Sequence, residues 1–348
     1  MAETEASKLP PFGRILSGQK PESTQESPIE PDLAIIDPHH HLRDRPGHLY
    51  LLPELLRDIT RGHKIEATVA VECTAMFRPD GPLELRPVGE TEFLNGIAAM
   101  SASGQYGPTR VCAGFVSYAD FGLGRSRVQA GLEAHMAAGN GRLRGIRNTV
   151  AWDRFDDIKN TRGTNRPHAL MDPAFREGFA CLAPLNLSFD TWLYFTQLDE
   201  AFDLAAAFPQ TTIIIDHCGG PVHIGPYVGK HDEVFSEWRT RLSDLARLPN
   251  VFLKIGGLGM ITLGFGLNRE PARPSSERLA GLWRPYIETC IDLFGPNRCM
   301  FESNFPPDKK SCDYGILWNG FKRVASQYTA AEKASLFKDT ASKVYRLT

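Results

Sequence analysis

The chain has 348 residues, of which 42% are hydrophobic and 23% charged, and its formal net charge is −2. This composition is typical of a globular protein, and the length suits one large domain or two smaller ones. No basic run with interleaved aromatic residues indicates nucleic-acid binding, and no stretch approaches the ~20 apolar residues of a membrane span. We therefore expect a small-molecule partner rather than a nucleic acid or a membrane.

Residues 1–31 are rich in Pro, Ser, Glu and Lys and lack the apolar core of a secretory signal. We expect a mobile tail there and a single domain over residues 32–348. The seven cysteines are scattered, form no C-x-x-C pair and are odd in number. Buried thiols in a reducing, cytoplasmic compartment are therefore the expectation.

Short apolar runs alternate with longer amphipathic segments after the tail. Several runs are too uniformly apolar for a half-exposed sheet and are typical of parallel strands covered by helices. Eight such strands predict a closed (β/α)8 TIM barrel. A doubly wound open sheet is the alternative, but it usually carries a Gly-rich phosphate loop after its first strand, where this chain has histidines. The predicted strands are Leu33–Asp37, Glu66–Glu72, Arg110–Val116, Leu143–Arg147, Leu187–Tyr194, Thr211–Asp216, Val251–Ile255 and Cys299–Ser303.

The clearest predicted helix covers residues 276–294, where apolar residues recur at three- and four-residue steps. Ser275 is its expected N-cap. A last helix is expected to open on the capping box formed by Thr329 and Glu332. Its apolar residues should lie on about one face, and they are Leu336, Phe337, Val344 and Tyr345.

Two connections that follow strands are long, residues 73–108 and residues 256–274. Loops after strands form the catalytic face of a barrel. We interpret both as candidate walls of a substrate site, with plain surface elaboration as the alternative.

The first predicted strand runs into His39, His40 and His41. Residues two apart in an extended chain point to the same side, so the His39 and His41 imidazoles should converge on one ion or one water. His40 should face the other way and be structural. Because an H-x-H strand end after an aspartate is much more specific than a lone histidine, we interpret His39 and His41 as a functional pair.

A further histidine, His217, follows the sixth predicted strand. Alternation places His217 on the same side as Ile215, and places Asp216 on the opposite side. Asp216 is then available to cap or orient the loop that follows.

Glu302 lies in the eighth predicted strand, one layer below Asn304 and on the same side. A carboxylate near a barrel interior is costly unless it is paired. Lys254, at the end of the neighbouring strand, is a natural partner. Two readings remain: a structural Lys254–Glu302 ion pair, or Glu302 as a base or ligand.

Glu72 raises the same question at the end of the second strand. Alternation puts Thr68 and Glu72 on one side and leaves Val69 and Val71 facing the helices. Arg147, which ends the fourth strand, is placed to hold a substrate carboxylate through two parallel hydrogen bonds. A loop salt bridge is the alternative for Arg147.

Five motifs occur in a characteristic order: Ile36-Asp37-Pro38-His39-His40-His41-Leu42, Arg144-Gly145-Ile146-Arg147, Leu187-Ser188-Phe189-Asp190, Asp216-His217-Cys218-Gly219-Gly220-Pro221 and the strand end from Met300 to Pro306. From about residue 34 to the C-terminus the chain resembles the amidohydrolase superfamily, specifically its branch of 2-pyrone-4,6-dicarboxylate lactonase and the sugar-acid lactonases. The resemblance implies a TIM barrel and ring-opening hydrolysis of a lactone by an activated water. The positions that match are His39, His41, His217 and Asn304.

The strand-eight position departs from the family pattern. That pattern has an Asp there as general base, whereas this chain has Asn304, and an amide cannot take a proton at neutral pH. Either the base has moved or the chemistry differs. Glu302 is our first substitute because it shares the side-chain direction, and Asp308 is the second.

The resemblance implies either no metal or one divalent ion, Zn or Mn. His39, His41, His217 and one carboxylate, with Glu72 as the candidate, would form an adequate site with an open position. A bound metal would lower the pKa of its water towards ~7 and reduce the need for a base. Loss of the strand-eight Asp removes a usual ligand and favours a weak or absent metal.

Our leading hypothesis is a hydrolase that opens a carboxylated lactone or related cyclic ester, with Arg147, Tyr194 and Asp308 as substrate contacts. A decarboxylase or hydratase is the second hypothesis, because the same barrel supports both. The third is a barrel that lost its catalytic base and only binds a ligand. Barrels of this kind commonly pair, so a homodimer is one expected assembly.

Overall fold

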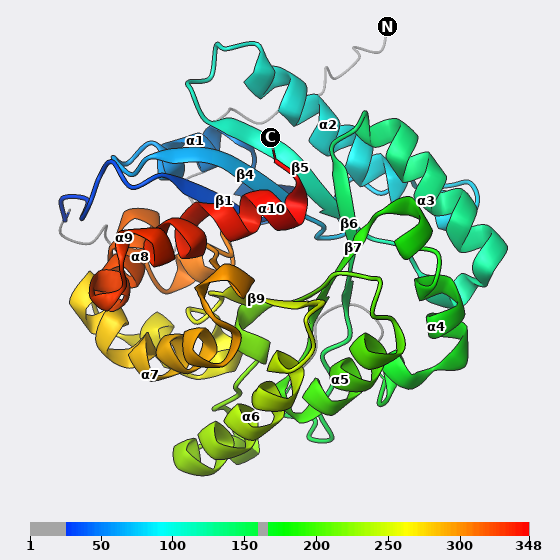
Figure 1. Ribbon diagram of the computed structural model, residues 1–348. Coiled ribbons are helices and arrows are strands. Elements are labelled where there is room, and N and C mark those ends of the chain that lie inside the picture. The colour runs from blue at the N-terminus through cyan, green and yellow to red at the C-terminus, as the bar shows by residue number, and fades with distance from the viewer. Residues whose placement is uncertain (1–25, 159–165, 348) are drawn as a thin grey trace, which may run out of the picture.

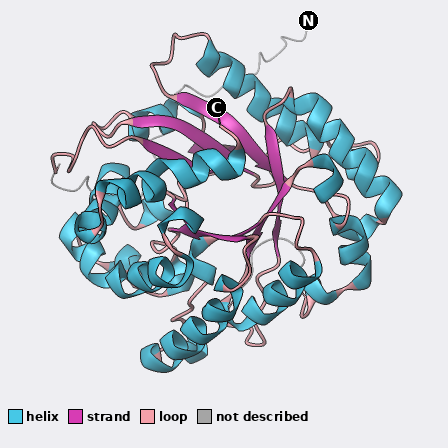
Figure 2. Cartoon of the chain, in the orientation of Figure 1, coloured by secondary structure: helices cyan, strands magenta, loops and turns pink. Residues whose placement is uncertain are grey.

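The computed structural model of the protein describes residues 26–158 and 166–347. Its main sheet has eight parallel strands in chain order, and a parallel bridge between His40 and Phe305 joins the two ends. Helices surround the strands (Figures 1 and 2). This is the predicted TIM barrel, and each predicted run overlaps one of its strands. The strands are β1 Ile35–His40, β4 Ile65–Val71, β5 Arg110–Ser117, β6 Leu143–Thr149, β7 Ser188–Trp192, β8 Ile213–Ile215, β9 Val251–Ile255 and β10 Cys299–Phe301.

The helices follow the strands around the outside of the barrel. A small antiparallel hairpin, β2 Arg43–Arg45 and β3 His48–Tyr50, is inserted directly after β1. The described helices are α1 Leu52–Ile59, α2 Val88–Ala102, α3 Arg125–Gly139, α4 Pro173–Phe179, α5 Leu198–Ala207, α6 His231–Ala246, α7 Ser276–Phe294, α8 Tyr314–Val324, α9 Ala330–Ala334 and α10 Thr340–Tyr345.

Helix α7 has the predicted boundaries. The hydroxyl of Ser275 accepts the backbone N–H of Arg278 at 3.2 Å, which satisfies one of the free donors at the start of the helix. Leu279, Trp283 and Ile287 lie on its buried face. The three- and four-residue spacing therefore predicted both the helix and the side that packs.

The C-terminal helix differs from the prediction. The capping box forms, because Thr329 and Glu332 each bond the backbone N–H of the other. A π-helical turn over Ser335–Asp339 then separates α9 from α10. Leu336 and Phe337 pack between barrel and helices, whereas Val344 and Tyr345 pack inside the barrel. The prediction of one shared face was wrong because the wider turn interrupts the helical period.

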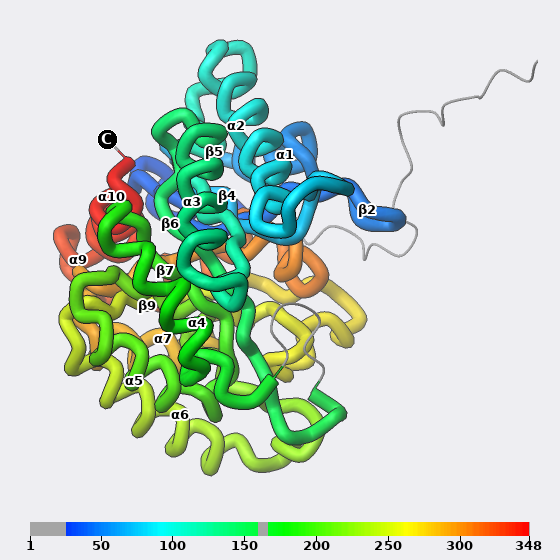
Figure 3. The backbone as a smooth tube through the Cα atoms, turned by 90° about the vertical axis from the view of Figure 1, so that its right-hand side faces the viewer, coloured from blue at the N-terminus to red at the C-terminus, as the bar shows by residue number. Residues whose placement is uncertain are grey.

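The barrel interior has its own small core. Ile36, Val69, Ile214 and Met300 pack there against α10. Because Ile36 lies near the start of β1, α10 covers the amino ends of the strands. Figure 3 shows α10 on one side of the molecule and β2 on the other. The C-terminal helix and the hairpin that follows β1 therefore occupy opposite ends of the barrel.

The side-chain directions predicted for β4 were reversed. Val69 and Val71 lie in the interior core, and Thr68 points outward to His40. Strands of a barrel are covered on both faces, so a strand with valines at one parity and small residues at the other does not reveal which side faces the helices.

The predicted mobile tail falls mostly on residues outside the described ones. At its end, residues 26–30 pack against α7 and α8. The backbone N–H of Ser276 donates to the Glu26 carboxylate at 2.8 Å, and the Asn319 amide donates to the Ser27 carbonyl at 3.0 Å. The last part of the predicted tail therefore belongs to the barrel domain.

The other bulk expectations concern thiols and membrane spans. All seven cysteines are buried thiols, as predicted. No helix within residues 26–158 and 166–347 has the length and apolar character needed to cross a membrane.

Candidate active site

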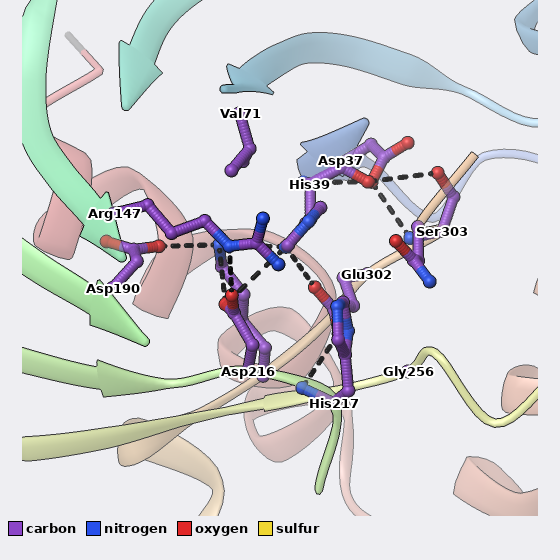
Figure 4. A network of polar contacts seen from close by, with 12 residues as sticks. Asp37, His39, Val71, Arg147, Asp190, Asp216, His217, Gly256, Glu302 and Ser303 are labelled. Atoms are coloured by element: carbon purple, nitrogen blue, oxygen red, sulfur yellow. Dashed lines mark hydrogen bonds and ion pairs between the residues drawn. The ribbon is translucent and has the colours of Figure 1, made fainter. Parts of the chain in front are cut away.

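Polar side chains from the carboxyl ends of several strands meet inside the barrel (Figure 4). His39 comes from β1, Arg147 from β6, and Asp216 and Glu302 from the residues directly after β8 and β10. With His217 they form one network, and none is more than 6% exposed. Charged groups held this far from water interact strongly, so their pairing decides their chemistry.

His39 and His41 converge as the alternation predicts. Their Nε2 atoms lie 3.3 Å apart. The Nδ1 atom of His41 lies 2.9 Å from the carbonyl oxygen of Val71. A carbonyl only accepts, so this Nδ1 carries the hydrogen and Nε2 keeps a lone pair. Burial, followed by the charge of His39, holds the pKa of His41 well below its usual range.

His40 faces away from this pair, as predicted. Its Nε2 atom lies 2.8 Å from the hydroxyl of Thr68, and the side chain is fully buried. Burial lowers the pKa of His40 to about 3. His40 is therefore a neutral structural histidine that ties β1 to β4.

Glu302 links two of the histidines. Its Oε1 lies 2.5 Å from Nδ1 of His217, and its Oε2 lies 2.7 Å from Nδ1 of His39. Burial alone would raise the pKa of Glu302, but His217 and His39 outweigh it and lower this pKa below its usual range. The carboxylate stays ionised and orients both rings, which is a poor state for the general base proposed from the sequence.

Lys254 has other partners than the predicted Glu302. Its Nζ atom lies 2.7 Å from Oδ2 of Asp190 and 3.4 Å from Oδ1 of Asp216. All of these groups are fully buried. The predicted structural ion pair with Glu302 was therefore wrong, because β7 and β8 supply carboxylates closer to the ammonium.

Asp216 lies within the network, not on the opposite side as predicted. Its Oδ2 accepts from Nε of Arg147 at 2.7 Å, and its Oδ1 lies 3.5 Å from Nδ1 of His39. Asp216 continues the inward parity of Ile214. His217 has a left-handed backbone with φ of 53° and turns back toward the interior. Strand alternation fails there because β8 has already ended.

Arg147 is held by the protein itself. Besides Asp216, it bonds Glu72, whose Oε1 accepts from Nη1 at 3.0 Å. The Nε and Nη1 donors of Arg147, which were predicted to hold a substrate carboxylate, therefore bond the carboxylates of Asp216 and Glu72. The Nη2 atom bonds neither of these two carboxylates. Glu72 is engaged by Arg147, so the geometry does not favour it as the metal's carboxylate.

Asn304 and Asp308 form a separate unit beside the histidines. Asn304 has a left-handed backbone with φ of 51°, so its side chain leaves the direction of Glu302. Its amide donates to Oδ1 of Asp308 at 2.9 Å, and Gly259 N–H donates to Oδ2 at 3.0 Å. Burial raises the pKa of Asp308 well above its usual range, against these two hydrogen bonds. The base role of Asp308 remains a prediction.

Trp192 was missed by the sequence analysis. Its ring meets that of His217 edge-on, with centroids 4.8 Å apart. Tyr194 packs on Trp192 and is only 2% exposed, and burial raises its pKa to about 12. Its role as a substrate contact remains a prediction. The sequence held a signal for Trp192, because Asp190 and Trp192 are two residues apart in β7 and therefore point to the same side of the strand.

The connection after β9 passes against the network, as expected for a wall of the site. A Cβ on Gly256 would lie 2.3 Å from Cγ of Glu302, and one on Gly257 would lie 2.6 Å from Cγ of His217. Gly257 also has a φ of 65°. Only glycine permits this approach, so the loop and the network are built together.

The cluster contains the donors of a divalent metal site. His39, Asp216 and His217 each offer a ligand atom, and these atoms lie within 4.8 Å of one another. Two tetrahedral nitrogen ligands at ~2.05 Å from a zinc ion are about 3.3 Å apart, which matches the Nε2 atoms of His39 and His41. Each of these rings is also oriented through its Nδ1 atom, as is usual for metal-binding histidines.

The charge balance of the cluster also fits a bound divalent metal ion. Its carboxylates outnumber its permanent cations by two when all are ionised. The carboxylates are Glu72, Asp190, Asp216 and Glu302, and the cations are Arg147 and Lys254. Protons on the histidines or a divalent ion would supply the missing charge.

A sequence profile described as Amidohydrolase matches residues 36–347. The chain belongs to the amidohydrolase family. This match covers every residue of the network and agrees with the resemblance seen in the sequence motifs.

Individual relatives differ in how much they reveal. An uncharacterised protein, y4mH of Sinorhizobium fredii, is 33% identical over 342 residues, which are 91% of this chain and 99% of that protein. An L-fucono-1,5-lactonase of Burkholderia multivorans is 30% identical over 210 residues, 56% of this chain and 67% of that enzyme. The family therefore includes lactonases similar to this amidohydrolase.

Solved structures confirm the fold. A zinc-bound amidohydrolase of B. multivorans has a TM-score of 0.68 at 24% identity and covers 90% of this chain and 100% of its own. A manganese-bound 5-carboxyvanillate decarboxylase of Novosphingobium aromaticivorans has a TM-score of 0.57 at 11% identity and covers 92% and 98%. At these identities the likeness shows the barrel alone.

Proposed function

We propose that this amidohydrolase opens a small carboxylated lactone or related cyclic ester by attack of an activated water. The observation that carries the proposal is the Glu302 bridge, which fixes the rings of His39 and His217 through their Nδ1 atoms. The similarity to L-fucono-1,5-lactonase supports a lactone as the substrate class.

His217 is the base that this geometry favours. An ionised carboxylate only accepts, so Nδ1 of His217 carries the hydrogen and Nε2 keeps a lone pair. Burial lowers the pKa of His217, which keeps the ring neutral at neutral pH. A neutral imidazole oriented by a carboxylate is the pairing that hydrolases use to take a proton from a nucleophile. In this proposal the base moves from position 304 to His217.

Charge that develops on the lactone oxygen needs donors or a cation nearby. Burial and Lys254 lower the pKa of His39, but Glu302 and Asp216 outweigh them and raise it. His39 is therefore the histidine most able to carry a positive charge. Around the network, His41, Arg147 and Trp192 retain the most exposure, at 5, 6 and 9%.

The same residues fit a divalent metal ion, as the zinc and manganese bound to structural neighbours suggest. His39, His41 and His217 would hold it, with Asp216 as the nearest carboxylate, and in that state His217 would act as a ligand rather than as the base. A bound ion would supply Lewis acidity and lower the pKa of a coordinated water towards ~7. The Glu302 carboxylate and the Val71 carbonyl would then keep the rings aimed at it.

The test is a panel of sugar-acid and dicarboxylate lactones assayed with the purified protein, alongside metal analysis. His217→Ala should lower kcat by about 10²–10⁴ on whichever lactone is opened, because it removes the base. Exposed His168 provides the matched control, and His168→Ala should keep wild-type turnover. Full activity of His217→Ala on the best substrate would show that this mechanism is wrong. Carbon dioxide release instead of ring opening would favour a decarboxylase.

A further inference from the structure

The hairpin that follows β1 turns one of its two sides toward the protein. Its strands pair Arg43 with Tyr50 and Arg45 with His48. Residues opposite each other in an antiparallel pair project from the same face, and so do residues two apart in one strand. These four side chains therefore share one side. Tyr50 on this side is only 3% exposed, whereas Leu49 on the other side is 45% exposed, so the side with the arginines faces the barrel.

Two contacts hold this side of the hairpin against its neighbours. Arg45 donates to the carbonyl of Cys73, in the connection after β4. Tyr50 and Lys309 both bond the carboxylate of Asp58 in α1, each at 2.7 Å, and Lys309 belongs to the turn after β10. The hairpin, the connection after β4 and the turn after β10 all follow strands. The arginines therefore lie at the carboxyl end of the barrel, the end opposite α10 (Figure 3).

Positive charge gathers on the barrel-facing side of the hairpin. Lys310 follows Lys309 in the turn after β10 and is exposed. Burial, followed by three nearby positive charges, lowers the pKa of His48. These charges belong to Arg43, Lys310 and Arg45. With Lys309, four permanent cations therefore lie around this side of the hairpin, and such a cluster attracts anions.

The network inside the barrel is a poor place for the carboxylate of a substrate. Its carboxylates outnumber its permanent cations, and two donors of Arg147 already bond Asp216 and Glu72. A substrate carboxylate placed among these acids would be repelled. Arg43 is two residues after His41, so the two Cα atoms are at most about 7 Å apart. A small lactone can therefore reach the network with its ring while its carboxylate stays at the hairpin.

We propose that the barrel-facing side of this hairpin is the carboxylate subsite of the enzyme, with Arg43 as the specificity-determining residue that binds the substrate carboxylate. The planar guanidinium matches a carboxylate through two parallel hydrogen bonds. Arg45 and the two lysines strengthen the attraction at longer range. The subsite rests on the proposed function for its kinetic test, but its binding test does not.

The binding test uses glutarate, a dicarboxylate without a bond to hydrolyse, and its uncharged diamide, glutaramide. The full chain is labelled with ¹³C and ¹⁵N in arginine, so that the Nε–Cζ correlation reports each guanidinium. Arg43→Gln assigns the Arg43 signal. We expect glutarate to shift this signal and glutaramide to leave it in place. An Arg43 signal that does not move with glutarate would overturn the proposal.

Variants measure how much Arg43 contributes to binding. Arg43→Gln should weaken glutarate binding by about 10- to 100-fold, because a charge-assisted hydrogen bond is lost. Lys310→Gln, at an exposed position, should weaken it by about two- to fivefold through the loss of charge alone. Arg57→Gln is the matched control, since Arg57 is an exposed arginine of α1 paired with Glu54. A loss in Arg57→Gln as large as that in Arg43→Gln would contradict a subsite at the hairpin.

Kinetics on an opened lactone separate the subsite from the proposed function. For a carboxylated lactone, Arg43→Gln should raise KM by about 10- to 100-fold with a smaller change in kcat. For the carboxamide of the same lactone, the variant should leave KM unchanged. Equal losses for acid and carboxamide would refute the subsite but not the hydrolase. Inert lactones together with the expected glutarate response would contradict only the proposed function.

Discussion

The Nδ1 atom of His217 lies 2.5 Å from Oε1 of Glu302, with both side chains buried. This contact gives His217 its tautomer and direction, so the carboxylate acts through the ring. Glu302→Gln keeps the size but puts an amide where two rings require an acceptor. One amide oxygen cannot serve both rings, and the amide nitrogen would meet an N–H.

We therefore expect Glu302→Gln to lower kcat by about 10²–10⁴ on a lactone that the wild type opens. Steady-state kinetics at several pH values measure the loss. Glu277→Gln is the control, because Glu277 is an exposed residue paired with Arg323. Equal kcat for wild type and Glu302→Gln would show that Glu302 does not take part in catalysis.

Arg147 bridges two buried carboxylates, and a lysine at this position can reach only one of them. Arg147→Lys should lower the free energy of unfolding by about 3 kcal/mol, since it leaves Asp216 or Glu72 unpaired. Urea unfolding measures this change. Arg127→Lys, at an exposed pair with Glu84, should cost less than about 1 kcal/mol.

The same variant tests the sequence-based role of Arg147 as a clamp for a substrate carboxylate. If Arg147 mainly held the substrate, Arg147→Lys would raise KM while stability stayed at the wild-type value. A large loss of stability would instead show that Arg147 mainly holds the barrel's own acids together.

The fold could be predicted because barrel strands are short, uniformly apolar runs that repeat regularly between helices. The convergence of His39 and His41 was also predictable, since the two residues are two apart at the end of β1, although the register of β1 shifts between Asp37 and His40. Prediction failed where strands end. His217 and Asn304 have left-handed backbones, and this turns their side chains out of the pattern.

Partner choice was the second failure. Lys254 was assigned to Glu302 because the two strands are neighbours, yet Asp190 from another strand is its nearest acceptor. Inside a barrel, side chains from non-adjacent strands meet across the axis. Sequence order gives strand neighbours but not these cross-barrel contacts, so the contacts of Asp190 with Lys254 and with Tyr345 could not be seen from the sequence.

Metal binding offers a test of the ligand set. We expect zinc or manganese to bind and a chelator to remove it, and His41→Gln to weaken binding strongly. Glu72→Gln should leave metal affinity near the wild-type value, because Glu72 is engaged by Arg147. Affinity should fall as the pH is lowered, since protons compete for the histidines.

Elemental analysis and competition with a chelator measure both effects. A loss of affinity in Glu72→Gln as large as that in His41→Gln would restore Glu72 as a ligand, as the sequence first suggested. Unchanged affinity in His41→Gln would exclude the H-x-H pair from the site.

Stability should fall on mild acidification because of buried neutral histidines. Burial lowers the pKa of His135 to about 4 and that of His40 to about 3, against roughly 6.5 in an unfolded chain. Between these values the unfolded state binds more protons than the folded state, so the free energy of unfolding decreases as the pH falls from about 6.5 towards 4. Urea midpoints at pH 7.5 and pH 5 measure the decrease.

His135→Gln should make the decrease smaller, because His135 lies in α3 away from the network and its hydrogen bond to Thr91 survives in a neutral amide. His168→Gln, at an exposed histidine, should leave the slope unchanged. Equal slopes in His135→Gln and the wild type would show that His135 is not among the groups that destabilise the protein in acid.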